Sequence, residues 1–298
     1  MPLPTKVCVA IQERPFLRAQ TTRVAAAPGS LGNYLGSRKC DGIDKSNVRP
    51  SAALWSLSRF DWNTCMADYD LYYWPVPFLG QFVRAVLAHS GKTWTESDPA
   101  AIATLMDGPV TRMAVPFMGP PLLVDKKTDF AIAEMPAILL YLGETLDLMP
   151  STAGRRAMSM KTINDANDVI DEITLDGGRQ MWTVKRWADF VPRLKRWMAF
   201  WEETGRRHGL TAHAGYLLGG ATPGVADVVT ATLWSTMTDR FRPIHTMLED
   251  AAPMTAALSR RISALPALAD LTAKAKQDYG DAFCGGEIEA SLRDVIES

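Results

Sequence analysis

The residue types that most often carry chemistry are few in this chain and widely separated. Its 298 residues include four histidines and four cysteines. His208 and His213 lie five apart, so they share no helical face, and we expect no metal site. The cysteines form no CxxC pair, which indicates a reducing compartment rather than a disulfide framework: Cys8, Cys40, Cys65 and Cys284.

Phosphate-binding and hydrolase motifs are also missing from the sequence. It contains no Walker loop, GxSxG elbow or HExxH helix. Gly219, Gly220 and Gly224 form a loop that leads into a helix, without the preceding strand that a dinucleotide fingerprint requires.

Two adjacent tyrosines, Tyr72 and Tyr73, stand in a short aromatic stretch. If that stretch is a strand, their side chains point to opposite faces.

The composition is that of a globular protein whose two regions differ in charge. Hydrophobic residues make up 47% and charged residues 22%, with a net charge of -1. Residues 1–60 hold nine basic and three acidic residues, so the remainder of the chain is acidic. An acidic body argues against nucleic acid as the main partner, because a phosphate backbone binds basic faces. No apolar run approaches the ~20 residues that span a bilayer.

Residues 1–66 show no sustained helical or strand period and are predicted to form a disordered basic leader. Arginines among Ser, Thr and Ala are typical of an organellar transit peptide. The alternatives are a flexible extension and an upstream start codon that is not used. The first twenty residues lack the apolar core of a secretory signal. We therefore expect a cytoplasmic protein, or an organellar one if the leader directs transit.

Residues 67–149 have the pattern of a small α/β domain. Short apolar stretches bounded by turn residues predict four strands, at 70–74, 93–96, 122–125 and 130–133. Helical spacing of apolar residues predicts helices over 78–89 and 136–143, whereas 99–113 has no clear period. The predicted order is βαβ followed by ββα.

Residues 150–298 show helical patterns only and are predicted to form an all-helical domain. Apolar stripes at helical spacing occupy 163–173, 190–201, 225–233 and 254–265. The third stripe is the most apolar, so we expect it at the centre of this domain. The join between the two domains is expected near residues 148–154.

Three segments in this framework together resemble the glutathione transferases. They are LYYW at 71–74 with VR at 83–84, PPLLVD at 120–125, and EMPAI at 134–138. The resemblance covers about residues 68–280. It implies a thioredoxin-like α/β domain followed by an all-α domain, and a tyrosine-type enzyme similar to the sigma and mu classes. Such an enzyme conjugates the glutathione thiolate to a hydrophobic electrophile in detoxification, as a homodimer.

The resemblance implies that Tyr73 stabilises the glutathione thiolate. A thiol with a pKa of about 8.5 is mostly protonated at neutral pH, and the thiolate is the nucleophile. Enzymes of this fold place a Tyr, Ser or Cys near the end of the first strand, and no Ser or Cys lies between Trp74 and His89. In the mu and sigma classes the tyrosine precedes an arginine by eleven residues, as Tyr73 precedes Arg84. The alternative is that Tyr73 is an ordinary core aromatic.

The resemblance also assigns residues to the rest of glutathione. Gly119 and Pro120 are expected to position its cysteinyl part, with Pro120 as the cis proline before the third strand. The alternatives are a cis Pro121 and two trans bonds. Glu134 and the N–H of Met135 are expected at a helix start, where they would bind the γ-glutamyl end. Met135 stands where the family usually has a serine.

The electrophile pocket is expected between the loop before the first helix and the first long helices of the second domain. Its candidate residues are apolar or aromatic: Trp74, Val76, Phe78, Met181 and Trp182. Met135 and the absence of the usual Arg-Gly pair after the tyrosine favour a different function. The alternatives are a non-catalytic module that binds hydrophobic ligands or proteins, and a glutathione-dependent isomerase or peroxidase.

Overall fold

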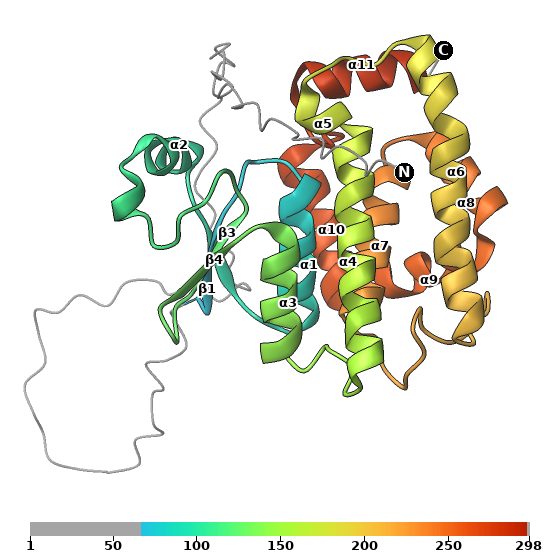
Figure 1. Ribbon diagram of the computed structural model, residues 1–298, viewed down its shortest axis with the longest axis horizontal. Helices are drawn as coiled ribbons and strands as arrows, with labels where there is room; N and C mark the ends of the chain where they lie inside the picture. Colours follow the sequence, from blue (N-terminus) through green and yellow to red (C-terminus); the bar gives the residue numbers. More distant parts are fainter. Residues whose placement is uncertain (1–66, 297–298) are drawn as a thin grey trace, which may run out of the picture. The chain divides into compact units, whose positions relative to one another are not determined.

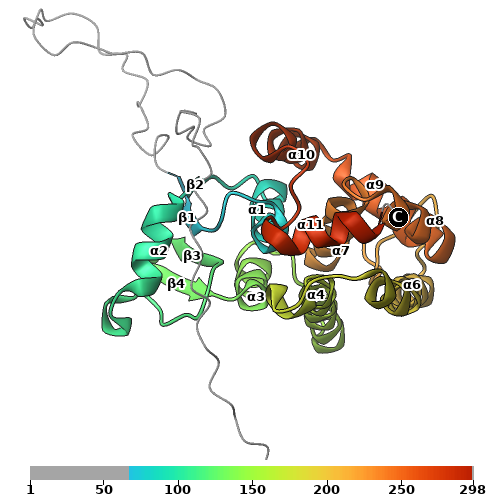
Figure 2. The same ribbon diagram turned by 90° about the horizontal axis from the view of Figure 1, so that it is seen from above.

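The computed structural model describes residues 67–296, so the predicted basic leader at 1–66 lies outside the described residues. The described chain forms a small sheet with helices and then continues as helices only (Figures 1 and 2). None of the helices within residues 67–296 is long and apolar enough to cross a membrane.

Four short strands form one mixed sheet in the order β2-β1-β3-β4. The strands are β1 (Tyr69–Tyr72), β2 (Trp94–Glu96), β3 (Leu122–Asp125) and β4 (Phe130–Ala133). β1 runs parallel to β2 and antiparallel to β3, and β3 pairs antiparallel with β4. This confirms the predicted βαβ-ββα order, because α1 (Phe78–His89) connects β1 to β2 and α3 (Met135–Thr145) follows β4.

The helices of this part differ in how much of their surface is buried. In α1 every residue from Gly80 to Leu87 is buried, because α1 packs against α3 as well as against α7 of the helical part. In α2 (Pro99–Asp107) only Ile102 is buried. The sequence therefore shows no apolar stripe there, and the helix begins at a local signal, the Asp98 carboxylate that accepts the Ala100 N–H.

Helices make up the whole of the described chain after residue 152, apart from their connections. They are α4 (Ala153–Ile173), α5 (Leu175–Gly178), α6 (Val184–Arg207), α7 (Val225–Thr238), α8 (Arg242–Ala251), α9 (Pro253–Ser263), α10 (Pro266–Tyr279) and α11 (Gly286–Ile296). Twelve of the 14 residues of α7 are buried, and α7 packs against α1, α4, α8 and α9. The prediction that this segment lies at the centre is confirmed.

The start of α7 joins the helical part to the connection that follows α3. The Asp227 carboxylate accepts the Gly224 N–H at 2.9 Å and the Leu217 N–H at 2.7 Å, and burial raises the pKa of this group. The Val225 N–H donates to the Leu148 carbonyl at 3.0 Å. A Cβ at Gly224 would lie 3.0 Å from that same carbonyl oxygen, so a glycine permits the close approach.

Candidate functional site

Tyr73 follows β1 directly, and its side chain is buried beneath the start of α1. Only 3% of the residue is exposed. Its hydroxyl oxygen accepts the Leu79 N–H at 3.1 Å. The ring fits there because the first turn of α1 contains Gly80: a Cβ at this position would lie 2.2 Å from the Tyr73 Cδ1. The sequence Leu79-Gly80 thus supplies both the hydrogen bond and the space.

The electrostatics of this position keep Tyr73 protonated. Burial raises the pKa of the Tyr73 hydroxyl, although the N–H groups of Leu79 and Gly80 and the Arg84 charge oppose the shift. The hydroxyl oxygen accepts from Leu79, while no residue within 67–296 accepts the hydroxyl proton. A protonated phenol with an unused proton can stabilise a neighbouring anion by a charge-assisted hydrogen bond.

Arg84 holds the loop between β1 and α1 in place. The residue is 1% exposed, and its guanidinium binds the Glu96 carboxylate through Nε–Oε1 at 2.7 Å and Nη2–Oε2 at 3.0 Å. Its Nη1 donates to the Val76 carbonyl at 2.9 Å. The guanidinium carbon lies 5.6 Å from the centre of the Tyr73 ring. The arginine eleven residues after Tyr73 is therefore a positioning residue for the loop and the ring.

Glu96 is a positioning residue that the sequence does not identify. The pairing of β1 with β2 sets Glu96 beside Leu71, near the end of β1, and from there its carboxylate reaches Arg84. Glu96 Oε1 also accepts the Trp94 Nε1 proton at 2.9 Å. The pattern Trp-Thr-Glu indicates a strand but gives no sign of an arginine twelve residues earlier.

The cis proline before β3 is Pro121, so the prediction of Pro120 is wrong. The cis peptide bond joins Pro120 to Pro121. Leu122 pairs with Ala133, and the Pro121 carbonyl accepts the Glu134 N–H at 3.2 Å, one position further along the same pairing. Pro120 therefore stands in the position that was assigned to Gly119. As a proline it has no N–H to donate and offers a ligand only its carbonyl.

Glu134 and Met135 form the start of α3, as predicted. Glu134 is exposed and has a left-handed backbone, with φ 72° and ψ 120°, which is rare outside glycine and is found at binding sites. The Met135 side chain is 1% exposed and packs in the core, so only its backbone N–H can face a ligand. No side chain caps this helix. The N–H groups of Met135 and Ala137 thus have no partner within the helix and can bind an anion.

The aromatic residues predicted for the electrophile pocket lie in two different settings. Trp74 and Phe78 are half-buried in the loop before α1 and at its first residue. Trp182 is buried, with its Nε1 proton donated to the Ile173 carbonyl at 2.9 Å and its backbone N–H to the Ser291 Oγ at 3.1 Å. Trp182 is therefore a core residue between α4, α6 and α11, and its exposed surface is small.

The segment of Phe283, Cys284 and Gly285, hereafter the 283–285 segment, lies against the loop before α1 and is not predicted by the sequence. Phe283 packs edge-on against Phe78, with ring centres 5.5 Å apart. Burial raises the pKa of Cys284 to about 12, so its side chain is a neutral thiol near neutral pH. Nothing in the local sequence of residues 283–285 connects them with the loop before α1.

No group of three potential metal ligands occurs among residues 67–296. The arrangement described above consists of one buried phenol, two backbone N–H groups at a helix start, and the exposed Glu134 carboxylate. A thioredoxin-like sheet that carries such a site and is followed by a helical layer defines a protein of the glutathione transferase fold.

Comparisons with known proteins lead to the same fold. Residues 158–295 match the family model for the glutathione S-transferase C-terminal domain. Similar solved structures include the Pi-class glutathione S-transferase of Onchocerca volvulus, with 15% identity, a TM-score of 0.56, and 70% of this chain and 94% of that chain covered. The described chain therefore has the fold of the glutathione S-transferases, and its helical part matches their C-terminal domain.

Two further solved structures have the same fold. The glutathione S-transferase from Ascaris lumbricoides is 18% identical with a TM-score of 0.56, and NaGST-2 is 21% identical with a TM-score of 0.56. Each alignment covers 70% of this chain and 97% of the other. None of the curated proteins matches the sequence. The domain match and the fold support a glutathione-related function in general, without specifying the reaction.

Proposed function

We propose that the protein is a glutathione transferase that joins the glutathione thiolate to a small hydrophobic electrophile. The observation that carries this proposal is the state of Tyr73: a protonated hydroxyl, oriented by the Leu79 N–H, with its own proton unused. A hydrogen bond from a neutral donor to an anion contributes about 1.5–3 kcal/mol, which corresponds to a thiol pKa lower by about one to two units.

The residues at the start of α3 would hold the γ-glutamyl end of glutathione. The N–H groups of Met135 and Ala137 would donate to its carboxylate, with the positive end of the helix dipole behind them. The exposed Glu134 carboxylate would accept from its ammonium group. The Pro120 carbonyl would accept the cysteinyl N–H, and the matching donor is missing because residue 120 is a proline.

The reaction then needs only one protein group at the sulfur. The glutathione thiol releases its proton to solvent, and the Tyr73 hydroxyl donates a hydrogen bond to the resulting thiolate. A sulfur electron pair forms the new carbon–sulfur bond, and the leaving group departs with the electrons of the broken bond. Tyr73 keeps its proton throughout, because burial raises its pKa.

The proposal includes a homodimer and a role in detoxification. Large apolar side chains are exposed on α6, α3 and β4, where a second copy of the chain could cover them: Val184, Phe200, Leu140 and Phe130. Sedimentation equilibrium of the full chain tests this part of the proposal, and a monomer at micromolar concentration would contradict it.

The test of the catalytic proposal is turnover of a chloronitroaromatic compound with glutathione. We expect Tyr73→Phe to lower kcat/KM by about tenfold or more, since it removes the donor to the thiolate. Tyr72→Phe is the matched control, because Tyr72 lies on the other face of the strand and is half-buried. An active wild type with equal rates for both variants would contradict the assignment.

A second candidate function is a non-catalytic module that binds hydrophobic ligands or proteins. The observations that favour it are the burial of Tyr73 and the missing N–H at Pro120. Calorimetric titration with glutathione separates the two functions: no heat of binding at millimolar glutathione would support the binding module.

Isomerase or peroxidase activity uses the same thiolate, and substrate profiling distinguishes it from conjugation.

A further inference from the structure

A small cavity lies between α1, α7 and α10, and its volume is about 30 Å³. Its wall on the side of α1 consists of Pro77, Gln81 and Ala85. These residues follow one another at a spacing of four, so they share one face of the helix. Neither Tyr73 nor Glu134 lines the cavity, which is therefore separate from the site proposed for glutathione.

The wall of this cavity is rich in hydroxyl groups. Five residues from α7, α10 and the end of α9 contribute them: Thr232, Ser235, Thr236, Ser263 and Thr272. The Thr232 hydroxyl donates to the Val228 carbonyl at 2.8 Å, so its oxygen can still accept a hydrogen bond. Cavities that stay dry are apolar, whereas a polar cavity of at least about 10–15 Å³ can hold a water molecule. This cavity is polar enough and large enough for one or two.

Gln81 places a buried amide at the same wall. The residue is 7% exposed, and no group within residues 67–296 donates a hydrogen bond to its buried Oε1. The next two residues of α1, Phe82 and Val83, are apolar and buried. Buried polar atoms are nearly always hydrogen-bonded, because an unmade bond costs the desolvation of the group. A glutamine at this position therefore calls for a donor from outside the described chain.

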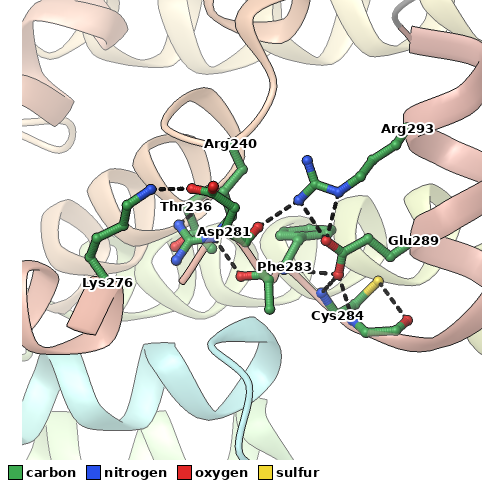
Figure 3. A network of polar contacts seen from close by, with 10 residues as sticks. Thr236, Arg240, Lys276, Asp281, Phe283, Cys284, Glu289 and Arg293 are labelled. Atoms are coloured by element: carbon green, nitrogen blue, oxygen red, sulfur yellow. Dashed lines mark hydrogen bonds and ion pairs between the residues drawn. The ribbon is translucent and has the colours of Figure 1, made fainter. Parts of the chain in front are cut away.

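The charged residues at the cavity favour a neutral ligand. Asp239 and Arg240, which follow α7, both line it. Arg240 donates from Nη1 to the Thr236 carbonyl at 3.2 Å and from Nε to the Ala282 carbonyl at 2.6 Å, which holds the guanidinium in place (Figure 3). A cation would be repelled by Arg240 and an anion by Asp239. The small volume excludes an organic molecule, so the ligand that fits is water.

We propose that this cavity is an internal water site, in which one or two water molecules hydrogen-bond to the Gln81 amide and the Thr236 hydroxyl. A water molecule both donates and accepts, so it can serve either end of the amide. Because Gln81 lies on α1 and Thr236 on α7, the water joins the α/β part to the helical part. The site is independent of the proposed transferase reaction, and its tests need no substrate.

The first test is a crystal structure of the full chain at a resolution that shows ordered water. We expect a water molecule within about 3.2 Å of the Gln81 amide, and this water or a second one bonded to it within about 3.2 Å of the Thr236 Oγ1. A parallel structure of Gln81→Met should lack the water beside residue 81, because the amide that binds it is gone. A Gln81 amide bonded only to protein groups, or a cavity without ordered density, would overturn the proposal.

The second test is the sign of the change in Tm for Gln81→Met. Methionine has nearly the same helix propensity as glutamine but has no amide. We expect the Tm to fall by about 2–4 °C, since the variant loses the hydrogen bonds to the bound water. If the Gln81 amide has no partner, methionine removes a buried unsatisfied group and the Tm rises. An unchanged or higher Tm would overturn the proposal.

Gln277→Met is the matched control for this measurement. Gln277 lies on α10, but it is exposed and does not line the cavity. The same chemical change should therefore leave the Tm within about 1 °C of the parent. A fall as large as that of Gln81→Met would show that the loss does not depend on the cavity, and it would overturn the proposal.

A second variant keeps the test valid if Gln81→Met does not fold. Thr236 is 7% exposed, and Thr236→Val removes its hydroxyl with little change of shape. We expect the Tm to fall by about 2–4 °C for the same reason, and a rise would overturn the water bridge. When both single variants fold, the double variant should lose less than the sum of the two losses, because the two residues share the bound water. Additive losses would contradict a shared partner and overturn the bridge.

Discussion

Helices α1 and α3 both belong to the small α/β part, but they differ at their starts. The polar groups at the start of α1 have hydrogen-bond partners within the protein, whereas no side chain caps the start of α3. At the start of α1 the Leu79 N–H donates to the Tyr73 hydroxyl oxygen, and the Val76 carbonyl in the preceding loop accepts from Arg84. At α3 no side chain caps the helix, and Glu134 is exposed. The site proposed for the sulfur is therefore fixed by internal packing, whereas the site proposed for the γ-glutamyl end is an open binding surface.

This difference predicts which mutations act on stability and which act on binding. Changes near α1 should destabilise the fold, because they leave buried groups without partners or space. Changes to the exposed Glu134 side chain should leave the fold intact and alter the KM for glutathione, because that side chain does not cap α3.

The largest effect is expected from Arg84→Met. It leaves the Glu96 carboxylate and the loop carbonyl of Val76 without their donor, which should lower the free energy of unfolding by about 3–5 kcal/mol. The control is Lys126→Met, which breaks the partly exposed ion pair with Asp70 and should cost less than about 1 kcal/mol. Urea unfolding measures both, and similar losses would contradict the positioning role of Arg84.

A smaller loss is expected from Gly80→Ala. The new Cβ would overlap the Tyr73 ring, and overpacking of this kind costs about 1–3 kcal/mol. Gly154→Ala is the control, since a Cβ there meets nothing within 4 Å and alanine favours a helix. Thermal unfolding should show a lower Tm for Gly80→Ala only. An unchanged Tm would mean that the ring is not confined by α1.

The stability of the fold should also fall at high pH because of Tyr73. Burial raises its pKa, so the folded state keeps a proton that the unfolded state loses above about pH 10. The unfolded state then binds fewer protons, and stability falls by up to about 1.4 kcal/mol per pH unit for this group. The stability is fully present below pH 10. Tyr73→Phe should show a shallower fall between pH 9 and 11, and an unchanged slope would contradict the burial of the hydroxyl.

The smallest effect is expected at α3, from Glu134→Gln. It should raise the KM for glutathione by about fivefold, since it weakens a charge-assisted hydrogen bond to the ammonium group. The Tm and kcat should not change. Glu144→Gln, near the other end of the same helix, is the control and should leave the KM unchanged. A fall in Tm for Glu134→Gln would show that the two helix starts do not differ as described.

Much of the fold follows from local patterns in the sequence. The bounds of α1, β3 and β4 agree with the apolar spacing and the turn residues, because each of these elements is defined by its own side chains. Helices α8 and α10 bury only two or three residues each, so neither produces a stripe that stands out from the surrounding sequence. The apolar pattern therefore predicts α8 and α10 less well than α7.

The parts of the site that could not be predicted depend on contacts between distant segments. Pro120 and Pro121 are equivalent as a local pattern, and the pairing of Pro121 with Glu134 distinguishes them. The rings of Phe283 and Phe78 pack edge-on against each other, although the two residues are about two hundred positions apart in the sequence. By contrast, Tyr73 and Glu134 could be proposed from the sequence, because the resemblance to the glutathione transferases assigns both from short motifs.

The most direct test of the account is a titration of the thiol of bound glutathione, followed by its ultraviolet absorbance. The hydrogen bond from Tyr73 predicts a pKa at least about one unit below the ordinary value of about 8.5 in the wild type. In Tyr73→Phe the pKa should return toward that value. Bound glutathione that titrates at the same pH in both proteins would contradict the central claim that the buried Tyr73 hydroxyl stabilises the thiolate.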